Sequence, residues 1–349
     1  MRVRGVIEGF YGEPWSHEER LDLIRFCGRH GLNTWVHAPK DDPYHRKLWR
    51  EPYPDAELER LAELVREAER HGVEFAYAIA PGLDVCYSSD AEFETLLRKC
   101  EQLRGIGVRS FQLLWDDIEH ELPHEADRKL YGHEERPSAA AQAPFCNRFA
   151  REWEQPGPLA VCPMGYAGTG DSPYRAIFGP RLDPEIVVYW TGPEVVSIGI
   201  TREALNLAVH RFRDHELLIW DNYPVNDFDR TRLFLGPLVG RDPRIADGRC
   251  AGLIANAMVE AVPSKLALAT VAEWCADPHA YDPVAAYERA LAAHGAEVVE
   301  ALRRLVARDE DCVVSTQSLP RPGDVRELIH ALELGVSPAV GLALLEPFV

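Results

Sequence analysis

The chain has 349 residues, a hydrophobic content of 46% and a formal net charge of −18 at pH 7. Its length and apolar content are enough for one large single-core fold or two ordinary domains. The strongly acidic balance argues against nucleic acid or an anionic membrane as a partner, because both are bound through a concentrated basic surface.

The sequence predicts a soluble protein of the cytoplasm. No window approaches eighteen consecutive apolar residues, and the first strand-like run begins at Val3, which leaves no room for a signal peptide. Because no C-x-x-C pair occurs, we expect small buried thiols in a reducing compartment rather than a disulfide framework or a zinc knuckle. The cysteines are Cys27, Cys86, Cys100, Cys146, Cys162, Cys250, Cys275 and Cys312.

Short apolar runs of strand length alternate with longer segments of helical period from the N-terminus onward. The predicted strands are residues 3–9, 33–37, 74–80, 110–115, 159–162, 186–190, 217–220 and 252–255. Two of the segments between them carry one apolar helical face each, at Leu58, Leu61, Leu64, Val65 and Ala68, and at Phe93, Leu96, Leu97, Cys100 and Leu103. This alternation is typical of a parallel sheet covered by helices.

These elements predict an α/β fold, a (β/α)8 TIM-type barrel with a C-terminal helical extension. Eight strands without a G-x-G-x-x-G motif after the first favour the barrel over a doubly wound sheet. We place the barrel at residues 1–280 and the extension at 281–349, because residues 284–293, 298–307 and 325–334 have helical periodicity and no further strand of comparable quality follows.

Polar and aromatic residues follow the predicted strands, at the end of a barrel where enzymes of this fold carry their active sites. Flat aromatic faces together with carboxylates and amides are the groups that bind the apolar face and the hydroxyls of a sugar. The candidate site residues are Gly9, Tyr11, Lys40, Asp116, Asp117, Tyr166, Trp220, Asn222, Asp227 and Asn256.

Each candidate alone also has a structural explanation. Lys40 beside two aspartates could form a solvated salt bridge, and Tyr166 could cover the core. Asn222 and Asn256 could cap helices or shape turns. Their joint position at one end of the predicted barrel favours a functional site.

The stretch FQLLWDDIEH, residues 111–120, is the most informative, because an apolar run ends there on two adjacent carboxylates, Asp116 and Asp117. Burying even one unpaired carboxylate is costly. A helix N-cap followed by a first-turn acid is the structural alternative.

Five stretches, GVIEGFYGEPWSHEERLDLI, LNTWVHAPKDDPYHRKLWR, LLWDDIE, YWTGPEVVS and IWDNYPVNDFDRTRLFLGP, resemble the catalytic barrel of family 84 glycoside hydrolases. These are β-N-acetylglucosaminidases that include protein O-GlcNAcases, and the resemblance spans roughly residues 4–274. It implies that Asp116 binds the acetamido N–H of the substrate and that Asp117 is the general acid/base, with no metal or other cofactor.

The resemblance also implies substrate-binding roles for the other candidates. Lys40 and Gly9 would bind ring hydroxyls, and Tyr166 would contact the acetamido carbonyl side of the pocket. Trp220 and Asn222 would shape the floor of the pocket, and Tyr11 belongs to the aromatic rim. Asp227 and Asn256 would hold the hydroxyls far from the scissile bond. The implied substrate is a terminal β-linked N-acetylglucosaminide on a glycan or on protein serine or threonine.

Neighbouring carboxylates at one strand end reach opposite faces of a glycosidic bond poorly, so the usual retaining pair is not expected. If the 2-acetamido oxygen of the substrate attacks the anomeric carbon, the two aspartates take different tasks. One orients the acetamido group as an anion, and the other donates a proton and later accepts one. This substrate-assisted scheme retains the anomeric configuration.

Two other classes of function stay open. Asp116, Asp117, Glu119 and His120 form an acidic cluster that could bind a metal for phosphoryl or hydrolytic chemistry. An aromatic rim brings a hard-metal site no benefit, and loss of activity with a chelator would favour this class. A catalytically silent barrel would instead bind N-acetylglucosamine without turnover.

Overall fold

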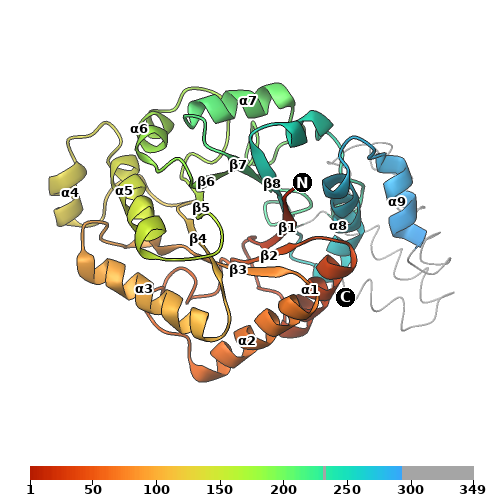
Figure 1. Ribbon diagram of the computed structural model, residues 1–349, viewed down its shortest axis with the longest axis horizontal. Helices are drawn as coiled ribbons and strands as arrows, with labels where there is room; N and C mark the ends of the chain where they lie inside the picture. The colour runs from red at the N-terminus through yellow and green to blue at the C-terminus, as the bar shows by residue number, and fades with distance from the viewer. Residues whose placement is uncertain (231–232, 293–349) are drawn as a thin grey trace.

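The structure is a computed structural model that describes residues 1–230 and 233–292. Eight parallel strands form a closed barrel in chain order, with β8 paired to β1. Figure 1 shows the helices arranged as an outer ring around this barrel. The predicted (β/α)8 fold is therefore confirmed.

The strands lie where the sequence predicts them, with boundaries that differ by one or two residues. They are β1 (Val3–Glu8), β2 (Thr34–His37), β3 (Glu74–Ile79), β4 (Ser110–Leu114), β5 (Ala160–Cys162), β6 (Val187–Trp190), β7 (Leu217–Asp221) and β8 (Cys250–Asn256).

Nine α-helices occur in the described part of the chain. They are α1 (His17–Arg29), α2 (Asp55–Arg70), α3 (Asp90–Gly105), α4 (Glu125–Tyr131), α5 (Pro137–Glu152), α6 (Pro173–Arg181), α7 (Arg202–Arg211), α8 (Ala261–Ala276) and α9 (Pro283–Ala292), and two 3-10 helices are η1 (Pro81–Leu83) and η2 (Pro243–Asp247). None of these helices is long and apolar enough to cross a membrane.

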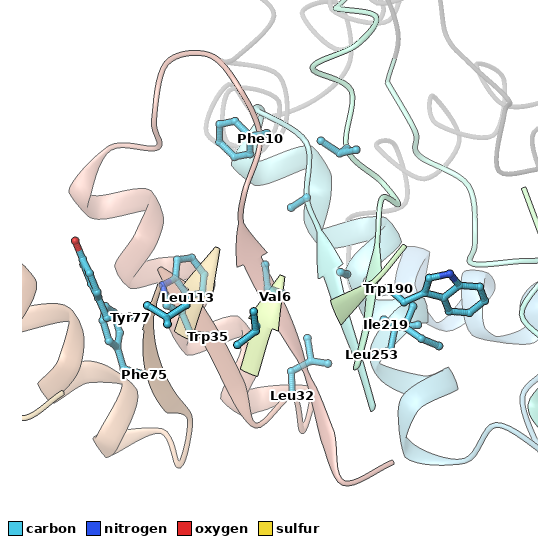
Figure 2. Close-up of a cluster of buried hydrophobic side chains, with 14 of the residues drawn as sticks. Val6, Phe10, Leu32, Trp35, Phe75, Tyr77, Leu113, Trp190, Ile219 and Leu253 are labelled. Atoms are coloured by element: carbon cyan, nitrogen blue, oxygen red, sulfur yellow. The ribbon is translucent and has the colours of Figure 1, made fainter. Parts of the chain in front are cut away.

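Successive strand residues point alternately toward the helices and into the barrel. Val6 of β1 and Trp35 of β2 belong to the outer cluster under the helices, which Figure 2 shows in part. Their neighbours Ile7 and Val36 belong to the inner cluster. Because both faces of each strand are buried, the strands read as nearly continuous apolar runs.

The interior of the barrel is filled largely by small side chains, with two aromatic rings near the carboxyl ends of the strands. Tyr189 and Trp220 pack edge to face, with ring centroids 5.6 Å apart. The Tyr189 hydroxyl donates to Oε1 of Gln112 at 2.8 Å, which satisfies a polar group inside the barrel. These contacts form a packed layer inside the barrel near the carboxyl ends of its strands.

The C-terminal part of the sequence is described as far as residue 292. The helix predicted at 284–293 corresponds to α9, which packs beside α8 (Figure 1). The helices predicted at 298–307 and 325–334 lie outside the described residues. The boundary at residue 280 and the helical extension to residue 349 therefore stay predictions.

Candidate active site

A cavity of about 200 Å³ opens at the carboxyl ends of the barrel strands. All ten candidate residues line this one cavity, although they are spread over nearly 250 positions of the sequence: Gly9, Tyr11, Lys40, Asp116, Asp117, Tyr166, Trp220, Asn222, Asp227 and Asn256. Strand closure brings them together, since each lies at the end of a strand or in the loop that follows it.

Asp116 is buried and its carboxylate has two unlike oxygens. Oδ2 accepts a hydrogen bond from the ammonium of Lys40, whose side chain is only 1% exposed. Oδ1 is buried without a hydrogen-bond partner among the described residues. The ion pair compensates the charge of Asp116, which lines the cavity, and Oδ1 stays an acceptor without a partner.

Lys40 is therefore not the surface salt-bridge residue that its neighbours in sequence allow. Its nitrogen also lies 5.5 Å from the ring centroid of Trp220 and 5.9 Å from that of Tyr11. At these distances an aromatic face stabilises a cation. Lys40 is thus held between the carboxylate of Asp116 and two aromatic rings of the cavity.

Asp117 is exposed to the cavity and differs from Asp116 in every contact. The hydroxyls of Tyr11 and Tyr166 donate to its Oδ2 and Oδ1, each at 2.8 Å. Its backbone has a φ of 53°, in the left-handed region, which turns the side chain away from the direction of β4. Among the described residues no lysine or arginine forms an ion pair with this carboxylate.

Both tyrosines keep their protons near neutral pH. Burial raises the pKa of Tyr11 above its ordinary value, and the nearby Asp117 contributes in the same direction. Burial also raises the pKa of Tyr166, together with its hydrogen bond to Asp117. The two hydroxyls are therefore donors that fix the plane of the Asp117 carboxyl group.

The indole of Trp220 forms the floor of the cavity, and its position depends on Gly9. A Cβ atom at Gly9 would lie 2.6 Å from Cζ2 of Trp220, which is closer than side chains approach each other. The indole Nε1 donates to Oδ1 of Asn222 at 3.0 Å. Glycine is thus required here for the close approach of the ring.

An amide network connects the floor with the ends of β1 and β8. Asn256 accepts from the backbone N–H of Gly9 at 3.2 Å and donates to Oδ1 of Asn222 at 3.0 Å. Asn222 in turn donates to the carbonyl oxygen of Val195 at 2.8 Å. Each amide keeps an N–H group that these bonds do not use, so the network can both hold its shape and donate to a ligand.

Asp227 accepts a hydrogen bond from the backbone N–H of Tyr11 at 2.8 Å and joins the loop after β7 to the loop after β1. It is half-buried at the side of the cavity. Its position is compatible with the predicted role in holding sugar hydroxyls, which stays a prediction.

Several cavity residues were not among the candidates from sequence. They are Cys162, Thr191, Val195, Val196, Val225 and Phe228. Val195, Val196 and Phe228 are exposed at the rim, where 37% to 54% of each side chain is accessible. The stretch YWTGPEVVS, which begins at the end of β6, is the sequence signal that pointed to this loop.

Arg46 is a further residue that sequence reasoning missed. It lies in the loop between β2 and α2, outside the cavity lining, and is half-buried. Its Nη1 donates to the Tyr11 hydroxyl at 2.8 Å and its Nη2 donates to the carbonyl oxygen of Asp117 at 2.7 Å. Nothing in the run HRKLWR distinguishes it from its basic neighbours.

The acidic cluster does not assemble as a metal site. Across residues 1–230 and 233–292, no three His, Cys, Asp or Glu side chains gather as ligands for a metal ion. Asp116 is paired with Lys40, and Nδ1 of His120 lies 3.3 Å from Oγ of Ser138 on α5. Asp116, Asp117 and His120, three of the four residues proposed as ligands, thus have different partners.

A family model described as beta-N-acetylglucosaminidase matches residues 4–307 of the chain. The chain is 40% identical over 276 residues to the protein O-GlcNAcases of Rattus norvegicus and Mus musculus. The match includes 77% of this chain but 29% of each relative, so the chain spans less than a third of their length.

Among solved structures, the fold is similar to that of a mutant of the Thermobaculum terrenum O-GlcNAc hydrolase. The TM-score is 0.87 at 32% sequence identity, and the likeness covers 100% of this chain and 81% of that protein. The family match and the likeness of fold therefore agree.

Proposed function

The chain belongs to glycoside hydrolase family 84, the β-N-acetylglucosaminidase family, and we propose that it removes terminal β-linked N-acetylglucosamine with retention of configuration. In this proposal the 2-acetamido group of the substrate is the nucleophile. The catalytic residues are Asp116 and Asp117.

The observation that carries the proposal is the unequal environment of these two adjacent aspartates. Asp116 is buried, paired with Lys40, and keeps Oδ1 as an acceptor without a partner. An unpaired buried acceptor costs roughly 1–3 kcal/mol, so a donor from the ligand is the natural partner. In our proposal the acetamido N–H of the substrate supplies that donor.

In the first step, the acetamido oxygen attacks the anomeric carbon while the bond from that carbon to the leaving oxygen breaks. Asp117 donates its proton to the leaving oxygen, and the anion of Asp116 stabilises the positive charge that develops on the acetamido nitrogen. The product of this step is a bicyclic oxazolinium ion, whose nitrogen keeps its proton beside the Asp116 anion, with Asp117 as carboxylate.

In the second step, a water molecule attacks the anomeric carbon from the face that the leaving group has vacated. Asp117 accepts a proton from the water, and the bond from the anomeric carbon to the acetamido oxygen breaks. The acetamido group is restored, and the two inversions give net retention. The hydroxyls of Tyr11 and Tyr166 donate to the two oxygens of the carboxylate that acts as base in this step.

The rest of the cavity supports recognition of one sugar ring. Trp220 offers an aromatic face, and Asn222, Asn256 and Asp227 offer amide and carboxylate groups around it. The binding roles of these residues, and of Gly9, Lys40 and Tyr166, are part of the proposal. Tyr166 in particular donates to Asp117 in this structure rather than toward a ligand.

We extend the proposal to N-acetylglucosamine on protein serine or threonine, because two relatives are named protein O-GlcNAcases. The exposed apolar residues Val195, Val196 and Phe228 at the rim of the cavity offer contact to the group that carries the sugar. Oligosaccharide substrates are the alternative that a comparison of glycopeptide and chitobiose hydrolysis would test.

The experiment that tests the proposed activity compares an aryl β-N-acetylglucosaminide with the matching aryl β-glucoside. We expect cleavage of the first and none of the second, because the glucoside lacks the nucleophile. Equal rates would contradict substrate assistance. Binding of N-acetylglucosamine without turnover would favour a silent sugar-binding barrel instead.

The cellular location stays a prediction. We propose a reducing compartment, and the seven cysteines in the described part of the chain are free thiols, five of them buried.

A further inference from the structure

We propose that Arg46 is a positioning residue for the acid/base Asp117, which it orients through Tyr11 and through the peptide backbone without pairing with the carboxylate. This inference rests on the proposed function, because it assigns Arg46 a task in proton transfer to the leaving group. Arg46 touches no reacting atom, since it lies outside the cavity lining.

The guanidinium of Arg46 is divided between two acceptors. Nη1 donates to the Tyr11 hydroxyl at 2.8 Å, and Nη2 donates to the carbonyl oxygen of Asp117 at 2.7 Å. Its Cζ also lies 5.8 Å from the centroid of the Tyr11 ring. The planar fork of an arginine can hold two acceptors at a fixed separation, which a lysine ammonium cannot do as rigidly.

The first of these bonds determines what Tyr11 does with its proton. The hydroxyl oxygen accepts from Arg46, and its single proton is donated to Oδ2 of Asp117 at 2.8 Å. Hydrogen bonds in such a chain strengthen one another. Without Arg46, the hydroxyl would be free to rotate toward water, and Asp117 would lose one of its two fixed donors.

The second bond acts on the backbone of Asp117. A left-handed conformation is unfavourable for a residue other than glycine, and φ at Asp117 is 53°. The bond from Arg46 to the Asp117 carbonyl oxygen helps to offset this cost. It therefore stabilises the conformation that presents the carboxyl group to the cavity.

The loop between β2 and α2 thus contributes one cationic side chain to each aspartate, one bound to a carboxylate and the other to a backbone carbonyl oxygen. Lys40 pairs with the carboxylate of Asp116, whereas Arg46 binds the backbone of Asp117. An arginine paired with the Asp117 carboxylate would hold it as an anion and prevent it from carrying a proton. The divided contacts of Arg46 avoid this while they still fix the residue.

The test measures kcat/KM of Arg46→Met and wild type on two β-N-acetylglucosaminides, one with an alkyl alcohol and one with a nitrophenol as leaving group. We expect a roughly 10- to 100-fold loss on the alkyl glycoside, part of the roughly 10²- to 10⁴-fold that general acid catalysis contributes. The loss on the nitrophenyl glycoside should be under about threefold, because nitrophenolate departs without a proton.

Two further variants examine the mechanism of the effect. Arg46→Lys keeps the charge but not the fork, so it should show a smaller loss with the same dependence on the leaving group. Tyr11→Phe removes the link to Asp117. The double variant Arg46→Met/Tyr11→Phe should lose less than the product of the two single losses, because both act on one chain of hydrogen bonds.

Arg50→Met is the matched control, since Arg50 lies in the same loop and pairs with Asp84 and Glu92 away from the cavity. It should keep the leaving-group dependence of wild type even if its stability falls. Parallel losses of Arg46→Met on both glycosides, or no loss, would overturn the inference alone. A wild-type protein inactive on both glycosides would overturn the proposed function and this inference with it.

Discussion

The ammonium of Lys40 donates to Oδ2 of Asp116, and both side chains are almost completely buried. The two residues are 76 positions apart in sequence and meet because β2 and β4 end at the same side of the barrel. This ion pair gives one of the two adjacent aspartates a buried cationic partner that the other lacks. Asp117 has tyrosine donors in place of a cation, and in our proposal it is the residue that exchanges a proton.

Lys40→Met should destabilise the protein, because it leaves the buried carboxylate of Asp116 without its cation. Breaking a buried ion pair from one side costs about 3–5 kcal/mol. Adding Asp116→Asn should restore much of this stability, since no uncompensated charge then remains, but it should not restore activity. Urea unfolding of the wild type, both single variants and the double variant measures this, and an unchanged stability of Lys40→Met would contradict it.

Gly9→Ala should displace the floor of the cavity, because the added methyl group would overlap Trp220. We expect a loss of about 1–3 kcal/mol in stability from the forced shift. The kcat/KM for the aryl N-acetylglucosaminide should fall as well. Gly105→Ala is the control, since a Cβ at the end of α3 would meet nothing within 4 Å. A wild-type kcat/KM for Gly9→Ala would contradict this prediction, because it would show that the Trp220 ring can shift without loss of activity.

A thiazoline fused to glucose should bind far more tightly than N-acetylglucosamine, because it resembles the cyclic intermediate. Analogues of high-energy states typically bind about 10²- to 10⁸-fold more tightly than substrates. Asp116→Asn should weaken this binding more than Asp117→Asn, since Asp116 faces the ring nitrogen in our account. Calorimetric titration of the three proteins gives the comparison, and equal affinities for thiazoline and free sugar would count against a cyclic intermediate.

His45 should make the protein sensitive to acid. Burial lowers the pKa of His45 to about 3, and Lys40, Arg46 and Lys99 nearby oppose its protonation further. In the folded protein, Nδ1 of the neutral ring donates a hydrogen bond to the carbonyl oxygen of Ala78 at 2.7 Å. Below its ordinary pKa of 6.5 the unfolded chain binds a proton that the folded chain does not, so stability falls as the pH decreases toward 3.

The expected contribution of His45 is a loss of roughly 2–3 kcal/mol in the free energy of unfolding between about pH 7 and about pH 4.5. His45→Gln should reduce this loss, because glutamine does not titrate. His210→Gln replaces an exposed histidine at the end of α7 and should leave the loss unchanged. Identical pH dependences of wild type and His45→Gln, from urea unfolding at each pH, would show that His45 is not responsible.

The fold could be predicted from sequence because the strands are buried on both faces and most of them are followed by an α-helix. The candidate site could be predicted because a closed barrel brings the carboxyl ends of all its strands together. Residues that follow different strands in the sequence therefore lie close to one another in space. For this reason the sequence assigns residues as distant as Gly9 and Asn256 to one site, and both line the cavity.

Contacts of individual side chains could not be predicted in the same way. The sequence places Lys40 beside Asp41 and Asp42, and only the fold shows that its partner is Asp116. Arg46 and Arg50 are equivalent in a basic run, and the course of the loop directs one to Asp117 and the other to Asp84. The partners of these side chains depend on the conformation of the loop, which the periodicity of apolar residues in the sequence does not predict.

The dependence of kcat/KM on leaving-group pKa, measured for Asp116→Ala and Asp117→Ala, tests the central claim most directly. The account predicts a steep dependence for Asp117→Ala, with losses of roughly 10²- to 10⁴-fold on alkyl or seryl glycosides and far smaller losses on nitrophenyl glycosides. For Asp116→Ala it predicts similar losses throughout, because the acetamido group attacks whatever departs. A steep dependence for Asp116→Ala with a flat one for Asp117→Ala would reverse the two roles, and full activity of either variant would contradict the claim that this pair is catalytic.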